Sequence, residues 1–187
     1  MPSPDLPAAL ARLEDRAAIT DLILEFARCI DDSDQAGYAA TFDEQCELVL
    51  PFAHLEGRAA IEAMPPPQPG MRTHHQLANI QITLGGTPDG DRSGDGTLTG
   101  SGAGGSGAVD GAGALTGSGA GDSAHSRAWV TATHVFDAAR PTDIAQAGGW
   151  YEHDLIRTPS GWRFRRVALT IVWHTPEPML RDTPPTP

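Results

Sequence analysis

The first part of the chain carries hydrophobic residues at helical spacing. Apolar side chains recur there at steps of three and four residues and form one stripe, at Leu10, Leu13, Ile19, Leu22, Phe26 and Ile30. This period predicts a long amphipathic helix whose stripe faces the protein core. The polar run "DDSD" from Asp31 predicts the end of the helix, because short polar side chains compete for backbone hydrogen bonds.

Shorter elements follow before the pattern changes. Asp34 has the position of an N-cap for a second short helix that carries Tyr38 and Phe42. The run "CELVLPF" predicts a strand that Pro51 ends, and "GRAAIEAM" predicts a short helix. The following "PPPQPG" cannot continue a helix, because proline lacks a backbone N–H and clashes with the preceding turn.

Beyond this point hydrophobic and polar residues alternate with a period of two, which is typical of strands. The alternating runs are rich in valine, isoleucine, threonine and tryptophan, and they read "HHQLANIQITL", "HSRAWVTATHVFDA", "GGWYEHDLIRT" and "GWRFRRVALTIVWH". The "TPSG" between the last two predicts a hairpin turn. Helices followed by strands predict an α+β fold, in which a curled antiparallel sheet carries the helices on one face.

Residues 85–123 have a composition unlike the rest of the chain. Glycine, serine, alanine, threonine and aspartate dominate there, and "LTGSGAG" occurs twice, at Leu98 and Leu115. Such a segment lacks the apolar area that would offset the entropy of ordering, so we expect a flexible loop inserted between two strands. A substrate lid or a calcium-binding repeat is the less favoured interpretation. We therefore expect one domain over residues 1–178 and a proline-rich disordered tail at 179–187.

Composition and charge argue against several classes of function. The formal net charge of −11 and the sequence pI of about 4.9 disfavour nucleic acid and anionic membranes as partners, since both attract basic surfaces. Uninterrupted apolar runs are too short to span a bilayer, and the N-terminus lacks the pattern of a signal peptide, so we expect a cytoplasmic protein. Cys29 and Cys46 form no C-x-x-C and are expected to be buried free thiols, not a disulfide or a metal site.

A few polar side chains at element ends or within apolar rows are candidates for chemistry. His134 belongs to a small, apolar row of alternate residues and should face the interior or a cavity. Tyr151 and His153 share one face of the next strand. Asp31 follows the helical stripe directly, where a carboxylate is unfavourable beside the negative end of the helix unless a histidine pairs with it. Without such a partner, Asp31 belongs to a solvated turn, and His134 is a core histidine with satisfied hydrogen bonds. Candidates of second rank are Tyr38, Asn79, Trp150 and Arg166.

Five segments in order resemble the SnoaL-like branch of the nuclear-transport-factor-2-like superfamily, whose members include scytalone dehydratase and bile acid 7α-dehydratase. They cover nearly all of the chain outside the glycine-rich insert and the tail, and they read "AAITDLILEFARCIDDSDQAGYAATF", "GRAAIEAM", "RTHHQLANIQI", "GGWYEHDLIRTPSGWRF" and "RRVALTIVWH". The resemblance implies a cone-shaped fold. A strongly curved antiparallel or mixed β-sheet wraps around a pocket in it, and N-terminal helices close the pocket.

The resemblance also implies roles for individual residues. In the dehydratase relatives an aspartate at the end of the first long helix partners a histidine that opens a strand, and these positions fall on Asp31 and His75. A second pocket histidine falls on His134. The first-helix tyrosine of these dehydratases is Phe26 here, and Tyr151 is the candidate to supply a hydroxyl from the opposite wall.

These assignments predict acid–base chemistry that needs no metal and no organic cofactor. An Asp31–His75 hydrogen bond would fix the tautomer of the imidazole, so that His75 takes a proton beside a carbonyl while His74 faces away. Tyr151 or His134 would then protonate the leaving hydroxyl or the enolate oxygen. The side chains expected to contact the substrate are Phe26, Tyr38, Asn79, Val130, His153 and Arg166.

The function that follows is a lyase or isomerase, of the dehydratase type, acting on a hydrophobic cyclic small molecule such as a polyketide or a steroid. A non-catalytic binding or assembly module, and the small subunit of an aromatic-ring-hydroxylating dioxygenase, stay open as alternatives, because one fold serves many functions. A homodimer or homotrimer is also expected, because one face of the sheet should carry exposed apolar side chains. These outward-facing residues are Trp129, Val135, Val167, Leu169, Ile171 and Trp173.

Overall fold

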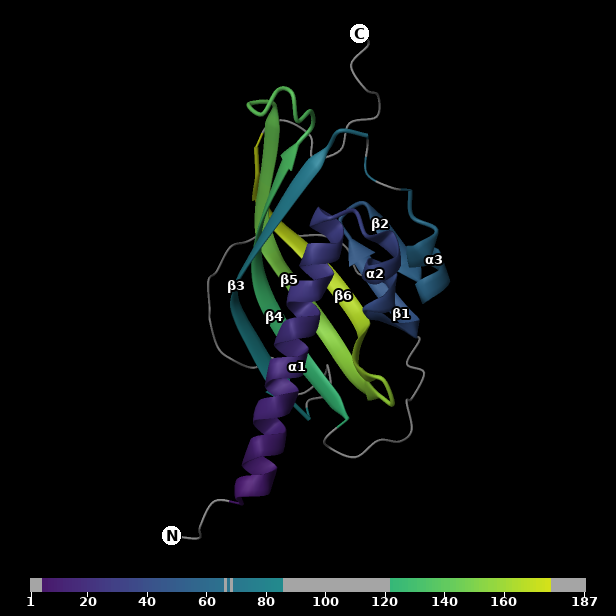
Figure 1. Cartoon of the computed structure of the whole chain (residues 1–187), viewed down its shortest axis with the longest axis vertical. Helices are drawn as coiled ribbons and strands as arrows, with labels where there is room; N and C mark the ends of the chain where they lie inside the picture. The colour runs from purple at the N-terminus through teal and green to yellow at the C-terminus, as the bar shows by residue number, and fades with distance from the viewer. Residues whose placement is uncertain (1–4, 66, 68, 86–121, 176–187) are drawn as a thin grey trace, which may run out of the picture.

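The computed structural model describes residues 5–65, 67, 69–85 and 122–175 (Figure 1). The elements within these residues are, in chain order, α1 (Leu6–Asp31), α2 (Gln35–Ala40), β1 (Phe42–Leu50), β2 (Ala53–Glu56), α3 (Arg58–Glu62), β3 (Arg72–Leu84), β4 (Ser123–Val135), β5 (Ile144–Thr158) and β6 (Gly161–His174). The predicted α+β class is confirmed, because helices and a single sheet make up the described chain. The short strand β2 was not predicted.

The strands join one open sheet in the order β2-β1-β6-β5-β4-β3. Neighbouring strands are antiparallel except β1 and β6, which run parallel, so the sheet is mixed. The sheet is twisted and curved, and α1 crosses its face (Figure 1). β2 and β3 remain as its two edges, so the curvature surrounds the interior without closing into a barrel.

Local sequence sets the ends of the first two helices. The carboxylate of Asp5 accepts a backbone hydrogen bond from the first turn of α1, and Pro7 lies in that turn, where a missing N–H costs nothing. After α1 ends, Ser33 adopts a left-handed φ of 58°, which turns the chain out of the helix. Asp34 then caps α2 as predicted, by accepting a hydrogen bond from the N–H of Gly37 at 2.8 Å.

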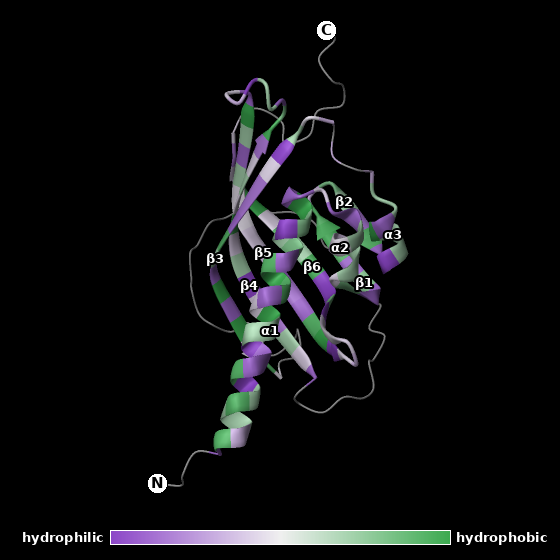
Figure 2. Cartoon of the chain, viewed as in Figure 1, coloured by the Kyte–Doolittle hydropathy of each residue, from purple (hydrophilic) through white to green (hydrophobic). Residues whose placement is uncertain are grey.

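The N-terminal turns of α1 project beyond the sheet. Figure 1 shows this end of the helix extending past the strands, and Figure 2 shows hydrophobic residues on it. Leu10 and Leu13 were predicted to face the core, but they are 55% and 64% exposed, so this part of the prediction is wrong. The side chain of Asp15, which pairs with Arg157, is less exposed, and the first fully buried residue of the helix is Ile19. The stripe therefore continues past the region where the sheet can cover it.

The core lies between α1 and the sheet and is centred on Phe26. Its ring is 1% exposed and contacts rings from α2, β1, β5 and β6 at centroid separations between 5.1 and 6.2 Å. These ring partners are Tyr38, Phe42, Tyr151, His153 and Phe164. One side chain of α1 thus packs against residues of four other elements. Phe42, predicted to lie on the second helix, is instead the first residue of β1.

A β-bulge in β6 changes which residues face the core. The β5–β6 register shifts at Arg165, which has no partner in the ladder. An extra residue in one strand turns the side chains that follow it to the opposite faces. Val167 is fully buried, and Leu169 and Ile171 line the cavity described below. The prediction that these three residues face outward is therefore wrong.

Tryptophans remain on the outer face of the sheet. Trp129 and Trp173 are 42% and 47% exposed, as predicted. A second register shift, at Val172, returns Trp173 to the outer face. The ring of Trp150 lies 5.3 Å from that of Trp129, and the guanidinium of Arg127 lies 4.3 Å from the Trp150 ring centroid. With three of its six predicted members turned inward, this face is less apolar than expected. Self-association as a homodimer or homotrimer stays a prediction, which the molecular mass in solution would decide.

Three other sequence predictions concern termini, loops and cysteines. Cys29 and Cys46 are buried free thiols, as predicted. No helix within the described residues is long and apolar enough to cross a membrane. Residues 86–121, which make up most of the predicted glycine-rich loop, and the predicted tail lie outside the described residues.

Candidate active site

The centre of the candidate site is a hydrogen-bonded pair, Asp31 and His75. Asp31 is the last residue of α1, and His75 lies near the start of β3. The Nδ1 atom of His75 lies 2.7 Å from Oδ1 of Asp31. The backbone N–H of His75 donates to Oδ2 at 2.9 Å, and the hydroxyl of Thr73 donates to Oδ1 at 3.0 Å. Several donors from one strand therefore hold the carboxylate in place.

These hydrogen bonds keep Asp31 ionised. Burial raises the pKa of its carboxyl, but the bonds from His75 and Thr73 stabilise the charged form more, so the pKa lies below its usual value. An ionised carboxylate only accepts hydrogen bonds, so Nδ1 of His75 carries a proton, and in the neutral imidazole the lone pair is then on Nε2. His75 is thus held in the tautomer that can accept a proton at Nε2.

His74, the neighbouring residue, lies on the opposite side of β3. Its side chain is 77% exposed, whereas that of His75 is 8% exposed. The Nδ1 atom of His74 lies 3.9 Å from Oδ2 of Asp31, too far for a hydrogen bond. The strand alternation therefore separates the two histidines into one cavity residue and one surface residue.

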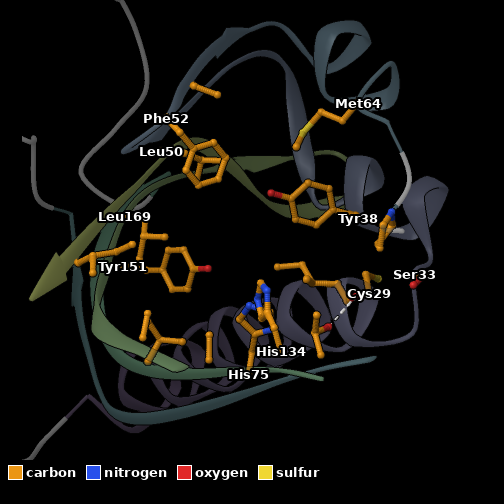
Figure 3. Close-up of a pocket in the computed structure, with 18 of the residues that line it drawn as sticks. Cys29, Ser33, Tyr38, Leu50, Phe52, Met64, His75, His134, Tyr151 and Leu169 are labelled. Atoms are coloured by element: carbon orange, nitrogen blue, oxygen red, sulfur yellow. Dashed lines mark hydrogen bonds between the residues drawn. The ribbon is translucent and has the colours of Figure 1, made fainter. Parts of the chain in front are cut away.

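His75 forms part of the wall of a cavity of about 570 Å³, which the curved sheet surrounds (Figure 3). Of the other predicted site residues, Tyr38, Val130, His134 and Tyr151 also line it. The rings of His75 and His134 lie close together, with centroids 6.1 Å apart. Most of the wall is apolar, and among the described lining residues none is Asp, Glu or Arg. Such a cavity favours an uncharged, hydrophobic ligand.

Tyr38 and Tyr151 bring hydroxyl groups to the cavity from α2 and β5 (Figure 3). Burial raises the pKa of both hydroxyls well above the usual value for tyrosine. The proximity of Tyr151 adds to this rise for Tyr38, and the charge of Asp31 adds to it for Tyr151. Both hydroxyls are therefore protonated at neutral pH and can donate hydrogen bonds.

Four residues predicted to contact a substrate do not line the cavity. Phe26 lies beneath the two tyrosines, in the core. Asn79 is exposed, with a φ of 51° at the register shift of β3. Arg166 pairs with Glu47 of β1 at 3.0 Å. The fourth, His153, is buried beside Tyr151.

His153 is a fully buried, neutral residue. Its Nδ1 lies 2.8 Å from Oγ of Ser126, and its ring stacks on that of Tyr151 with centroids 5.8 Å apart. Burial lowers the pKa of its imidazole to about 3, so it is uncharged at neutral pH. His153 can therefore support Tyr151 from behind but does not reach a ligand in the cavity.

Sequence reasoning missed part of the cavity wall. Leu50 ends β1, Phe52 lies in the turn between β1 and β2, and Met64 follows α3 (Figure 3). These positions lie at element ends, where no periodic pattern indicates the direction of a side chain. Thr73 could have been found, because it shares a strand face with His75 two residues away.

The described residues offer few groups for a metal or a covalent intermediate. No set of three or more His, Cys, Asp or Glu side chains among them is placed to bind a metal ion. Cys29 lines the cavity, but burial raises the pKa of its thiol to about 11. The thiolate that a nucleophile requires is therefore scarce at neutral pH. The polar groups in the cavity wall are imidazole rings, hydroxyl groups, the amide of Gln35 and the thiol of Cys29, and the rest of the wall is apolar.

This α+β fold has a curved, open sheet around an apolar cavity, and the wall residue His75 pairs with Asp31. The chain belongs to the SnoaL-like domain family, which matches residues 11–120 and 115–168. No curated protein matches the chain.

Solved structures share this fold. A proposed scytalone dehydratase from Novosphingobium aromaticivorans is 18% identical over 92% of this chain and 93% of that chain, with a TM-score of 0.61. A nuclear-transport-factor-2-like protein with a cystatin-like fold from the same organism is 22% identical over 92% of both chains, with a TM-score of 0.61. A hexachlorocyclohexane dehydrochlorinase from Novosphingobium barchaimii is 15% identical over 95% of this chain and 99% of that chain, with a TM-score of 0.60. At these identities the likeness shows the fold alone.

Proposed function

We propose that this protein is a cofactor-independent lyase or isomerase that acts on an uncharged, hydrophobic, cyclic small molecule. The observation that carries the proposal is the 2.7 Å contact between Asp31 and His75, a histidine that lines an apolar cavity. Two structural neighbours are named as a dehydratase and a dehydrochlorinase, and these names describe the elimination of water and of hydrogen chloride. Such eliminations and double-bond isomerisations can begin with the removal of a proton from carbon, which a histidine base performs.

In the proposed reaction His75 takes a proton from the carbon next to a ring carbonyl. The proton goes to Nε2, and the negative charge of Asp31 stabilises the imidazolium that forms. Elimination is completed when an acid protonates the departing hydroxyl, and isomerisation when a proton returns to another carbon. Tyr151 and His134, which line the same cavity, are the candidate acids. The apolar wall excludes water and strengthens these interactions.

The size and lining of the cavity support a multi-ring substrate. Its volume of about 570 Å³ lies within the range of about 300–1,000 Å³ that is usual for small-molecule sites. The described lining residues include no acidic or basic side chain other than histidine, so the cavity offers no ion pair to a carboxylate or a phosphate. A polyketide-like or steroid-like ring system has the required shape and polarity.

Replacing Asp31 by asparagine tests the proposal directly. We expect the protein to accelerate the exchange of the α-protons of 2-tetralone, an uncharged bicyclic ketone, for deuterium in D₂O, measured by NMR. Asp31→Asn should lower this rate by a factor on the order of 10²–10⁴, because an amide no longer fixes the tautomer or stabilises the imidazolium.

The matched control is Asp32→Asn. Asp32 is the next residue, its side chain is 58% exposed, and it pairs with Arg28 at 2.7 Å, away from His75. Its replacement should leave the exchange rate unchanged. A non-catalytic binding module would bind 2-tetralone without accelerating exchange above the buffer rate, and that result would refute the proposed function.

Asp31 should also make the stability of the fold depend on pH. Its pKa is lowered in the folded state, so the carboxylate stabilises the fold at pH values above the usual aspartate pKa of 3.8. As the pH falls below 3.8 toward the lowered pKa, this stabilisation is lost. Wild type should therefore exceed Asp31→Asn in free energy of unfolding at pH 7, with a gap that narrows in acid. Urea titrations between neutral and acidic pH measure the gap, and a gap independent of pH contradicts the assignment.

A further inference from the structure

We propose that the hydroxyl groups of Tyr38 and Tyr151 form a two-donor subsite that binds one oxygen atom of the ligand. The oxygen is the carbonyl oxygen of a cyclic ketone, which gains negative charge when the neighbouring carbon loses its proton. This assignment of a ketone substrate rests on the proposed function, since the proton acceptor is His75.

The first argument is that both hydroxyls lack an acceptor among the described residues. Tyr38 is 7% exposed and Tyr151 is 4% exposed, and both line the cavity. The two side chains make ring contacts with Phe26, Phe42 and His153, and neither hydroxyl is hydrogen-bonded to a described residue. Both hydroxyls are therefore free to donate to an acceptor that enters the cavity from outside the chain.

The second argument is that the two hydroxyls converge. Figure 3 shows them pointing from opposite walls into the space between the two rings. The ring of Phe26 lies against both, with centroids 5.1 Å from Tyr38 and 5.3 Å from Tyr151. Because Phe26 is fixed in the core, it sets the spacing of the two donors. One acceptor atom between them can receive both hydrogen bonds.

The third argument concerns charge. Burial raises the pKa of both hydroxyls, so each remains an O–H donor at neutral pH. A carbonyl oxygen accepts two hydrogen bonds, and it accepts them more strongly as negative charge develops on it. Once His75 holds the proton, its charge offsets that of Asp31, and the developing oxyanion faces no net negative charge from this pair.

The electron count of the step is balanced. The C–H bond next to the carbonyl breaks and its proton goes to Nε2 of His75. The C–H electron pair forms a C=C bond, and the π pair of the carbonyl moves onto the oxygen held by the two tyrosines. In an elimination the oxygen pair re-forms the C=O bond, the C=C pair forms a double bond to the next carbon, and the C–O bond on that carbon breaks. Because Tyr151 holds the carbonyl oxygen in this arrangement, the departing hydroxide takes its proton from the imidazolium in place of Tyr151 and leaves as water.

The two tyrosines of this chain are its only ones, so tyrosine-specific labels report on this subsite alone. Protein labelled with ¹³C at the tyrosine Cζ should give two NMR signals. Titration with 2-tetralone should shift both signals. Titration with tetralin, which has the same ring frame without the oxygen, should leave them nearly unmoved. A shift of only one signal, or of neither, overturns the two-donor subsite.

Substitutions that keep the ring give a second measurement. Tyr38→Phe and Tyr151→Phe should each weaken the binding of 2-tetralone by about fivefold to tenfold, the worth of one hydrogen bond, and leave tetralin affinity unchanged. Each should lower the α-proton exchange rate by about 10²-fold, as for the loss of one oxyanion-hole donor. Equal losses for tetralin and 2-tetralone would show a packing effect and overturn the proposal.

Failure of the subsite and failure of the proposed function give different results. If His75 is unnecessary for exchange while both tyrosine signals respond to the ketone, the base is wrong and the subsite stands. If exchange requires His75 but the tyrosine signals do not shift with the ketone, His75 is supported as the base and the two-tyrosine subsite is wrong.

Discussion

His75→Ala should abolish the protein-catalysed exchange of the α-protons of 2-tetralone while the protein stays folded. The imidazole is the proton acceptor of the proposed reaction, and the loss of a positioned general base lowers a rate by a factor of about 10²–10⁴. The backbone N–H of residue 75 still donates to Asp31 at 2.9 Å in the variant, and the Thr73 hydroxyl remains. The truncated side chain opens into an existing cavity, so the fold loses little packing.

His74→Ala is the matched control for this experiment. It removes the same chemical group one residue away, from a side chain that is 77% exposed. Its exchange rate should equal that of wild type. If the exchange rate of His75→Ala is within a few-fold of wild type, His75 is not the base. His134, the other imidazole in the cavity wall, would then be the next candidate.

The pairing of Asp31 with His75 was open to prediction because two independent signals agreed. A carboxylate at the C-terminal end of a helix is unfavourable without a partner, and the family resemblance assigned that partner to the start of a strand. Strand alternation then distinguished His75 from His74. The distance of 2.7 Å between the two side chains is the outcome of folding residues 44 positions apart in the chain.

The facing of residues in β6 could not be predicted, because the sequence does not mark the bulge. In the run "WRFRRVALTI" the two consecutive arginines are chemically equivalent, and only the register with β5 leaves Arg165 unpaired. A prediction from strict alternation therefore placed Leu169 and Ile171 on the outer face of the sheet, whereas they line the cavity. The same limit applies to Leu10 and Leu13. A periodic stripe shows which face of a helix is apolar, but not how much of the helix the sheet covers.

Residues that build the site without touching the ligand were also hidden from the sequence. Phe26 was expected at the cavity because the relatives have a tyrosine there. It lies one layer deeper, where its ring supports Tyr38 and Tyr151. A phenylalanine within a helical stripe has the same pattern in both places, so the distinction depends on how closely the helix approaches the sheet.

Phe26→Ala should cause the largest loss of stability among the substitutions considered. Removing a fully buried phenylalanine from a packed core costs about 3–5 kcal/mol of unfolding free energy, which is a large part of the stability of a typical domain. The loss here should fall at the upper end, because the ring contacts five others from four elements. Urea denaturation of wild type and variant measures it.

Phe52→Ala provides the comparison, because it deletes the same side chain at a position where that side chain is 62% exposed. Its effect on the free energy of unfolding should be within about 1 kcal/mol.

Where Phe26→Ala remains folded, the space left by the ring should release Tyr38 and Tyr151 from their fixed spacing. The two ¹³C tyrosine signals should then broaden, and the preference for 2-tetralone over tetralin should decline. If the folded variant keeps sharp tyrosine signals and the full preference for 2-tetralone over tetralin, contacts other than those of Phe26 position the two tyrosines.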